Sequence, residues 1–563
     1  MQSAGCRSRG TGGCAGRDGR LRNRRSTCVP CSPPWRSSVL RGVIPDGGVV
    51  SAYKDETLVV EPHGIEQIPD GERHGRPSGL FGLWFGANAE IATWALGTLS
   101  VALYGTSLKG AIFGLLIGNL AGCVLLGVLA TFGARKGVPQ MVQSRYAFGF
   151  FGNMIPAALT YLSGIGWFAI NTVFGTYALV TLTHLPYVAA LVAMLVFQVV
   201  IAVYGYNAIH AFERVMAYGL GAAFAILLVV TIPRVNFAAP FNPHAPLAFG
   251  GEFAGIILST ALSFSYAAGW MPFASDYSRY LPAATSPKRI WLNVFLGAAL
   301  PCIVLESMGA AAMTAVHGAS ADASPTDIVM TLLGSGVLAY VGLIAVTFGT
   351  LTANILNIYS GAIGGLVLKD ARRAWTSPLL LAVMFGAATA FLLSLAKNGG
   401  TPLPVAVVAI ASLIVAAAVL VVSRFSLLRW QAAILVGVLG GALSLGGSDP
   451  AQTAKLYTNF LLVLSYWVAP WAAVVFVAWL TGGRESPAER LYERQPAFGA
   501  GLVAWIAGFV VSVPFWSQAW YVGPIAKSLP RIGDISYYVG FVVAAVVYLT
   551  LARRREEVAA TAS

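Results

Sequence analysis

The chain has 563 residues, of which 57% are hydrophobic and 10% are charged, and its mean hydropathy is +0.71. This balance argues against a large soluble enzyme and predicts a polytopic membrane protein built from α-helices. The formal charge of +13 does not indicate nucleic-acid binding, because nine Arg and two Asp crowd into residues 1–48 and most other cations lie in short loops between apolar runs.

Residues 1–50 differ from the rest of the chain. They are rich in Arg, Gly, Ser and Cys and have no continuous apolar core of the kind that a signal peptide needs. Cys28 and Cys31 form a lone C-x-x-C without a second pair at metal spacing, so we predict no metal site. We interpret 1–50 as a disordered basic tail or a mis-assigned translation start, followed by a cytoplasmic segment at 51–79.

Fourteen apolar runs have about the length that crosses a bilayer, and they define a membrane domain over residues 80–552. A short cytoplasmic tail, residues 553–563, follows. The predicted spans are 81–104, 110–132, 155–182, 187–204, 215–233, 252–274, 290–314, 332–358, 376–396, 402–423, 430–447, 456–480, 498–516 and 535–552.

The loops between these spans alternate in charge. With the N-terminus in the cytoplasm, the inward loops and the C-terminal tail carry eighteen Lys and Arg, whereas the outward loops carry six. Because cytoplasmic loops are enriched in Lys and Arg, both termini are expected inside, with the protein in the plasma (inner) membrane.

The first span is interrupted by polar residues. Asn88, Glu90 and Thr93 lie in its first third, and Gly86 would let the helix unwind beside them. A carboxylate at this depth is costly unless it faces a polar cavity or a partner, so Glu90 predicts a functional site. The alternative is a helix whose polar residues hydrogen-bond a neighbouring helix.

The sixth span repeats this feature, because Gly269 and Pro272 stand where its helix should continue. Two broken helices five spans apart predict an inverted repeat in which both breaks line one central cavity. An ordinary proline kink is the alternative. Asp276 lies with Arg279 and Tyr280 at the inner end of this span and forms either a salt-bridged gate or a solvated loop cluster.

Trp167 and Asn171 lie four residues apart in the third span and therefore share one helical face. An indole beside a carboxamide suits a planar heteroaromatic ligand, because the ring stacks and the amide both donates and accepts hydrogen bonds. Trp270, at the sixth-span break, would supply the opposite face of such a sandwich. Each tryptophan taken alone is more typical of a core residue or an interfacial anchor, and only the combination with Asn171 and the two breaks favours a site.

The eighth span carries a polar stripe that contains Thr350, Asn354 and Asn357. Hydroxyls and carbonyls here would suit a sodium ion, and the amides would reach the edge of a ligand. The alternative is a set of hydrogen bonds that hold helices together.

Several segments together resemble the nucleobase–cation symporter-1 family, in particular its purine–cytosine permease branch. The resemblance runs from about residue 58 to 368 and from about 429 to 552. Its main segments are LWFGANAEIATWALGTL (83–99), GVPQMVQSRYAFGFFG (137–152), GIGWFAIN (164–171) and GWMPFASDYSRYLP (269–282), supported by GYNAIHAFERV (205–215) and LTANILNIYSGAI (351–363).

The resemblance implies an all-α transporter of 12–14 spans, with five-plus-five inverted-repeat topology, broken first and sixth helices and additional C-terminal helices, that works by alternating access. It implies that Trp167 stacks on the base and Asn171 hydrogen-bonds it, with Trp270, Asn354 and Asn357 as further contacts. Asn88 and Glu90 join them as predicted substrate contacts.

The same resemblance implies a coupling-ion site between Gly86–Ile91 and the eighth span, at Thr352 and Ala353. Ala353 replaces a hydroxyl of sodium-coupled members, which weighs against sodium here. Glu213 resembles a glutamate on the cytoplasmic side that serves gating or assembly and not binding, and it is assigned, like Asp276, to gating.

The chain also departs from the family, which usually has twelve spans. The extra pair falls at 376–423 and is interpreted as an inserted helical hairpin. Two added spans preserve the orientation of everything downstream.

These residues predict uptake of a nucleobase such as cytosine or a purine, or of a related planar heterocycle, coupled to protons or sodium. Glu90 either carries the proton, since burial favours the uncharged form of a carboxyl, or only accepts a hydrogen bond. The alternative is an amino-acid or other small-solute symporter of the same fold. No motif in the sequence indicates a channel or an enzyme. No cofactor beyond the cation is expected, and the oligomeric state is not predicted.

Overall fold

The structure is a computed structural model, and it describes residues 59–248, 250–316, 323–334, 336–372, 428–445, 450–518 and 521–562. The predicted tail at 1–50 and the predicted hairpin at 376–423 lie outside these residues. Within them the secondary structure is helical apart from one isolated bridge between Ser517 and Val522.

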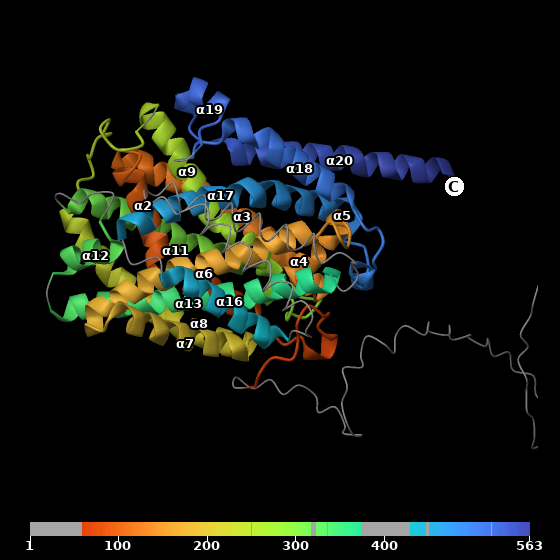
Figure 1. Ribbon diagram of the computed structural model, residues 1–563, viewed down its shortest axis with the longest axis horizontal. Helices are drawn as coiled ribbons and strands as arrows, with labels where there is room; N and C mark the ends of the chain where they lie inside the picture. The colour runs from red at the N-terminus through yellow and green to blue at the C-terminus, as the bar shows by residue number, and fades with distance from the viewer. Residues whose placement is uncertain are drawn as a thin grey trace, which may run out of the picture. The chain divides into compact units, whose positions relative to one another are not determined.

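The long helices run side by side through the molecule (Figure 1). The first half contains α1 (Pro77–Asn88), α2 (Ile91–Ala102), α3 (Leu108–Lys136), α4 (Gln140–Gln143), α5 (Arg145–Phe148), α6 (Met154–Thr183), α7 (Tyr187–Tyr204) and α8 (Tyr206–Thr231). The second half contains α9 (Gly251–Gly269), η4 (Met271–Phe273), α10 (Ala274–Ser278), α11 (Pro287–Ala315), α12 (Pro325–Leu333), α13 (Val337–Arg372), α16 (Arg429–Ser444) and α17 (Pro450–Ala478). The chain then forms η6 (Trp479–Gly483), η7 (Ala488–Tyr492), α18 (Ala500–Ser512), η8 (Val513–Phe515), α19 (Pro524–Ser528), η9 (Pro530–Ile532) and α20 (Ser536–Ala562).

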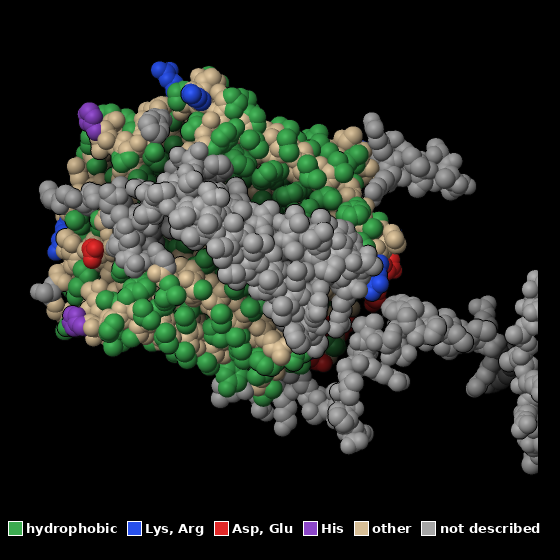
Figure 2. All heavy atoms as spheres, viewed as in Figure 1, with side chains coloured by type: hydrophobic (Ala, Val, Ile, Leu, Met, Phe, Trp, Pro, Cys, Tyr) green, Lys and Arg blue, Asp and Glu red, His purple; other side chains and the backbone are tan. Residues whose placement is uncertain are grey.

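Nine helices of the described residues are long and apolar enough to cross a membrane, and α2 and α18 are shorter apolar helices. On the face drawn in Figure 2, hydrophobic side chains cover most of the described surface, and the charged side chains visible there lie at its edges. A surface of this kind fits a lipid environment, because water is not available to solvate charges along the spans.

The predicted spans within the described ranges all fall on helices, but two boundaries were wrong. The helix predicted to begin at 215 begins at Tyr206, so the segment that contains Glu213 is helical and not a loop. Polar side chains in its first two turns lower the local hydropathy, so a search for apolar runs misses the start of this helix. The span predicted to end at 358 continues to Arg372, which places the polar stripe of α13 in mid-helix.

Both predicted breaks are present. Between α1 and α2, Ala89 and Glu90 leave the helical conformation, with φ/ψ of −82°/65° and −139°/169°. The other break follows Gly269, where α9 gives way to the short turn η4 around Pro272 before α10 begins. Breaks free backbone groups that a continuous helix would pair.

Helix contacts in the two halves mirror each other. Helix α3 packs on α9 in the same way that α11 packs on α1 and α2. The contact of α8 with α1 corresponds to that of α17 with α9. The contact of α6 with α16 corresponds to that of α13 with α7. This reciprocity is that of a five-plus-five inverted repeat, with α1/α2 and α9/α10 as equivalent broken helices. The described helices therefore supply all ten core segments, with α16 and α17 as the ninth and tenth.

The core helices form two bodies. Helices α1, α2, α3, α9, α10 and α11 pack on one another and are called the broken-helix body, whereas α6, α7, α13 and α16 form the scaffold body. Glycines permit the closest contacts in the broken-helix body: a Cβ on Gly309 would collide with the Trp94 carbonyl oxygen, and one on Gly97 with that of Glu306. The end of the bundle that carries Lys136, Arg279 and Arg429 is called the basic end.

Candidate functional site

The two helix breaks lie against each other. The Trp270 indole N–H donates to Asn88 Oδ1 at 2.9 Å, and the Tyr266 hydroxyl donates to Glu90 Oε1 at 2.9 Å. These bonds join the end of α1 and the start of α2 to α9 and the turn that follows it. The two breaks that were predicted to line one central cavity therefore adjoin, and the cavity itself stays a prediction.

Glu90 stands at the N-terminus of α2 and is fully buried. Its Oε2 has no hydrogen-bond partner among the described residues, and Oε1 is held by Tyr266, whose hydroxyl also lies 2.6 Å from Thr93 Oγ1. A helix N-terminus favours negative charge, but burial opposes it. A carboxyl balanced in this way suits a change of charge or a ligand contact.

Trp167 brings α6 to the break of α9. The Trp167 ring packs edge-on against Tyr266 and Phe460, with centroids 5.3 Å away in each case. A Cβ built on Gly269 would lie 3.0 Å from Trp167 Nε1, so the indole faces the break of α9. The absence of a side chain at Gly269 makes room for it.

Asn171 lies about one turn further along α6 and is fully buried. Neither its amide nitrogen nor its amide oxygen has a hydrogen-bond partner among the described residues. Leaving a buried polar group unpaired costs about 1–3 kcal/mol. An unpaired carboxamide beside an indole therefore indicates a place where a polar, flat ligand would complete the bonding.

Trp270 belongs to a different aromatic cluster from Trp167. Its ring lies edge-on to Trp84 at 5.6 Å and to Phe273 at 6.2 Å, and its N–H is taken by Asn88. Asn88 also donates to the Trp84 carbonyl oxygen at 2.8 Å. Both side chains thus tie the breaks together, and their contact with substrate stays a prediction.

In the polar stripe of α13, Asn354 bonds neighbouring helices, whereas one oxygen of Asn357 has no partner in the described part of the chain. The Asn354 amide donates to Phe168 O, Thr172 Oγ1 and Gln198 Oε1 at 2.8–3.1 Å, which joins α13 to α6 and α7. This is the interhelical role considered from the sequence. Asn357 donates to Asn354 Oδ1 at 3.4 Å, and its own Oδ1 is unpaired among the described residues.

Thr352 and Ala353 lie beside the first break, as the predicted ion site requires. Thr352 Oγ1 donates to the carbonyl oxygen of Gly86 at 2.8 Å and to that of Gly349 at 2.6 Å. Ala353 is fully buried and offers no hydroxyl. Oxygens that could take a sodium ion are therefore near one another, and the ion site stays a prediction.

Glu213 lies deeper than a gate at the surface would. It is fully buried about two turns into α8, and its side chain packs against Gly86 near the first break. Both carboxylate oxygens lack hydrogen-bond partners among the described residues. The gating role assigned to it stays a prediction.

Asp276 is buried, so the alternative of a solvated loop cluster was wrong. Its Oδ1 accepts a hydrogen bond from the backbone N–H of Gln140, the first residue of α4, at 3.0 Å. Arg279 bonds instead to Glu61, 3.1 Å away, which the sequence did not single out. Asp276 and Arg279 thus fasten the basic end through separate contacts, and their gating role stays a prediction.

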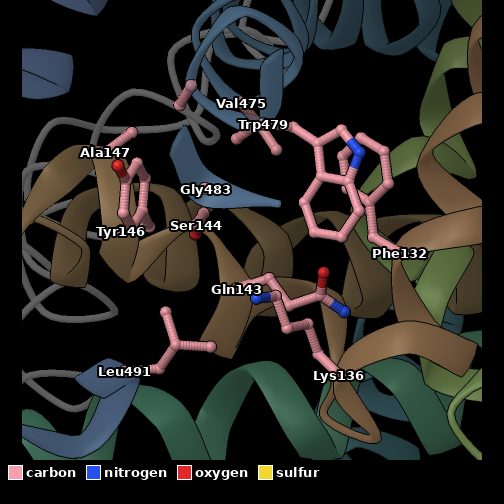
Figure 3. Close-up of a pocket in the computed structure, with 11 residues that line it drawn as sticks. Phe132, Lys136, Gln143, Ser144, Tyr146, Ala147, Val475, Trp479, Gly483 and Leu491 are labelled. Atoms are coloured by element: carbon pink, nitrogen blue, oxygen red, sulfur yellow. The ribbon is translucent and has the colours of Figure 1, made fainter. Parts of the chain in front are cut away.

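The structure also has a shallow hollow at the basic end, lined by residues of α3, α4, α5, α17, η6 and η7 (Figure 3). Phe132 and Trp479 stack there with centroids 3.8 Å apart, and Lys136 Nζ lies 5.6 Å from the Trp479 ring centroid. None of the predicted site residues lines this hollow. It is therefore separate from the helix breaks.

The sequence analysis did not identify two tyrosines near the helix breaks. Tyr266 bonds Glu90 and packs on Trp167, and Tyr457 of α17 donates to Ala92 O at 3.0 Å and also packs on Trp167. Tyr266 lies three residues before Gly269, so its position next to a predicted break was the available signal. Tyr457 had none, because only tertiary packing brings α17 to this place.

The sequence was then compared with known protein families. A profile of the family described as "Permease for cytosine/purines, uracil, thiamine, allantoin" matches residues 67–365, which is more than half of the chain. The chain belongs to this permease family. The recognition of the nucleobase–cation symporter-1 family from sequence segments is confirmed.

Relatives in this permease family extend along most of the chain. The purine-cytosine permease fcyB of Emericella nidulans is 26% identical over 513 residues, which cover 88% of each protein. The vitamin B6 transporter TPN1 of Saccharomyces cerevisiae is 23% identical over 342 residues, 58% of each. The chain is thus a transporter and not an enzyme.

Solved structures confirm the fold class. Mhp1, a nucleobase-cation-symport-1 family transporter in a closed conformation with bromovinylhydantoin bound, has a TM-score of 0.61 at 16% identity and covers 88% of this chain and 95% of its own. A Na+-coupled sialic acid symporter, in a substrate-bound outward-open state, has a TM-score of 0.51 at 10% identity and covers 86% and 91%. The permease is an integral membrane transporter with this broken-helix fold.

Proposed function

We propose that this permease is a symporter of the plasma membrane that imports a nucleobase such as cytosine or a purine, or a related planar heterocycle. The proposal rests on the carboxamide of Asn171, which is unpaired among the described residues and lies one turn along α6 from the Trp167 indole that faces the break of α9. The indole supplies a surface for stacking, and the amide supplies one donor group and one acceptor for the ring edge. The substrates named for its relatives are consistent with this chemistry.

The proposed coupling ion is a proton carried by Glu90. Its free Oε2 faces no cation among the described residues, and Ala353 lacks the hydroxyl that a sodium site would use. Protonation would change the charge at the break and so bias the equilibrium between outward-open and inward-open states. The Lys and Arg bias of the loops supports a cytoplasmic position for the basic end and for both termini.

The test is uptake of radiolabelled cytosine into proteoliposomes, with and without a pH gradient and with and without sodium. Unlabelled cytosine, adenine, uracil, allantoin and leucine compete in parallel. Competition by planar bases and acceleration by an inward proton gradient are expected. Competition by leucine alone would favour an amino-acid symporter, and acceleration by sodium alone would remove Glu90 from the coupling role.

A further inference from the structure

Described residues 59–76, called the strap, precede α1 and cross the basic end of the bundle (Figure 1). Its backbone bonds both bodies. The N–H of Glu61 donates to the carbonyl oxygen of Tyr204, the last residue of α7 in the scaffold body, at 3.0 Å. The N–H of Ile68 donates to Gly137 O, just after α3 in the broken-helix body, at 2.8 Å.

The carboxylate of Glu61 reaches the broken-helix body through residues that follow α10. Arg279 Nη2 lies 3.1 Å from Glu61 Oε1, and the Tyr280 hydroxyl donates to the same oxygen. Arg279 Nη1 also donates to the carbonyl oxygen of Gly64 in the strap at 2.6 Å. The side chains of Glu61 and Arg279 are both fully buried.

The same carboxylate reaches the scaffold body. The Tyr359 hydroxyl of α13 donates to Oε1 at 2.9 Å, and Arg429 Nε at the start of α16 lies 3.7 Å from Oε2. The backbone N–H of Tyr206 donates to Oε2 at 2.9 Å. One buried carboxylate is therefore shared by guanidinium groups from two different bodies.

The charge balance of this network depends on Glu61. Burial alone would raise the pKa of Glu61, but Arg429 and Arg279, with hydrogen bonds from Tyr280 and Tyr206, hold the pKa below its ordinary value. The carboxylate is thus ionised at neutral pH. Removing a shared partner leaves buried charge uncompensated, which is the costly way to break a buried ion pair.

We propose that Glu61 is a gating residue of the transport cycle, whose carboxylate latches the two bodies together at the basic end and must be released before the substrate leaves there. Alternating access separates two bodies at one end of the bundle at a time. Because Glu61 bonds Arg279 in one body and Arg429 in the other, that separation has to break one of the two ion pairs. The inference rests on the proposed transport cycle but not on the identity of the substrate.

A labelling experiment tests the latch without any substrate. Ser360 on α13 is buried beside the latch residue Tyr359, so Ser360→Cys, in a variant whose six native cysteines are replaced, reports opening at the basic end. A membrane-impermeant maleimide is applied to inside-out and right-side-out vesicles. Glu61→Gln should raise the labelling rate in inside-out vesicles about tenfold or more, because the equilibrium shifts toward the open state.

Glu66→Gln is the matched control. Glu66 lies in the same strap and accepts a hydrogen bond from the Gly64 N–H at 2.8 Å, a contact within the strap. Its labelling rate should equal that of the parent. If Glu61→Gln is folded by size-exclusion chromatography and labels at the parent rate, the latch is wrong.

A cross-link provides a second test if Glu61→Gln fails to fold. A Cβ on Gly64 would lie 3.3 Å from Leu366 Cδ1 of α13, so Gly64→Cys with Leu366→Cys can be joined by a short thiol cross-linker. The control pair, Gly364→Cys with Thr160→Cys, has the same 3.3 Å separation inside the scaffold body.

The strap continues into α1 of the broken-helix body, so a cross-link from Gly64 to α13 joins the two bodies whichever ion pair opens, and it should abolish uptake. The control cross-link should leave most of the uptake. Uptake that survives the strap-to-scaffold cross-link would overturn the proposal. Failure of the substrate proposal is distinguishable, because base uptake would then be absent from the parent while Glu61→Gln would still accelerate labelling.

Discussion

Asn171→Ala should weaken substrate binding without weakening the fold. Each neutral hydrogen bond contributes about 0.5–1.5 kcal/mol, so loss of two bonds to a base would cost about 1–3 kcal/mol, or roughly 5- to 150-fold in KM or Kd. In the substrate-free protein both amide atoms of Asn171 are buried and unpaired among the described residues. Removing them should therefore leave the unfolding temperature unchanged or raise it.

Asn354→Ala is the matched control, because it deletes the same chemical group from a neighbouring buried position. The Asn354 amide donates to Phe168, Thr172 and Gln198. Its loss removes the donor that the structure shows for Gln198 Oε1, whereas Thr172 Oγ1 still accepts from Gln198 Nε2, and should cost about 1–3 kcal/mol of stability. The two variants thus predict opposite signatures, one in binding and the other in folding.

The assay combines two measurements on purified protein in nanodiscs. Thermal unfolding without substrate reports stability, and binding or uptake of labelled base over a concentration series reports affinity. If Asn171→Ala lowers the unfolding temperature as much as Asn354→Ala and leaves KM unchanged, Asn171 is a structural residue and the site is misplaced.

Three further predictions concern the same region. Trp167→Phe should retain part of the base affinity, and Trp167→Ala should lower that affinity about tenfold or more, because stacking is worth about 1–3 kcal/mol per base. Equal affinities of the two variants in a binding assay would contradict this. Glu90→Gln should remove the pH dependence of uptake between pH 5 and 8, and an unchanged pH profile would exclude Glu90 as the proton carrier. Gly309→Ala should lower stability by about 1–3 kcal/mol in thermal unfolding, because its Cβ collides with Trp94 O. Its control, Gly82→Ala, meets no atom of the described residues within 4 Å and should be neutral or stabilising, so equal losses would refute the packing argument.

The helix breaks could be predicted from sequence because local chemistry causes them. Pro272 lacks a backbone donor, and Glu90 in an apolar run is tolerable only beside a polar partner. The start of α8 was missed for the converse reason, since its polar first turns, with Asn207 and Glu213, read as a loop although tertiary packing keeps them helical.

The roles of the three asparagines could not be separated from sequence. Within the described part of the chain Asn171 has no partner, whereas α6 and α7 hold Asn354 and Trp270 holds Asn88. These differences depend on residues from other helices, which the spacing along one helix does not reveal. The same holds for Glu61, which lies in a polar segment without periodicity and gains its significance from Arg279 and Arg429.

The most direct measurement is a structure of the protein with a bound heavy-atom derivative of its base, such as a brominated pyrimidine. We expect the ring to lie over the Trp167 indole at the two helix breaks, with its polar edge at the Asn171 carboxamide. A base bound instead in the hollow that Phe132 and Trp479 line, with Asn171 still unpaired, would contradict the account.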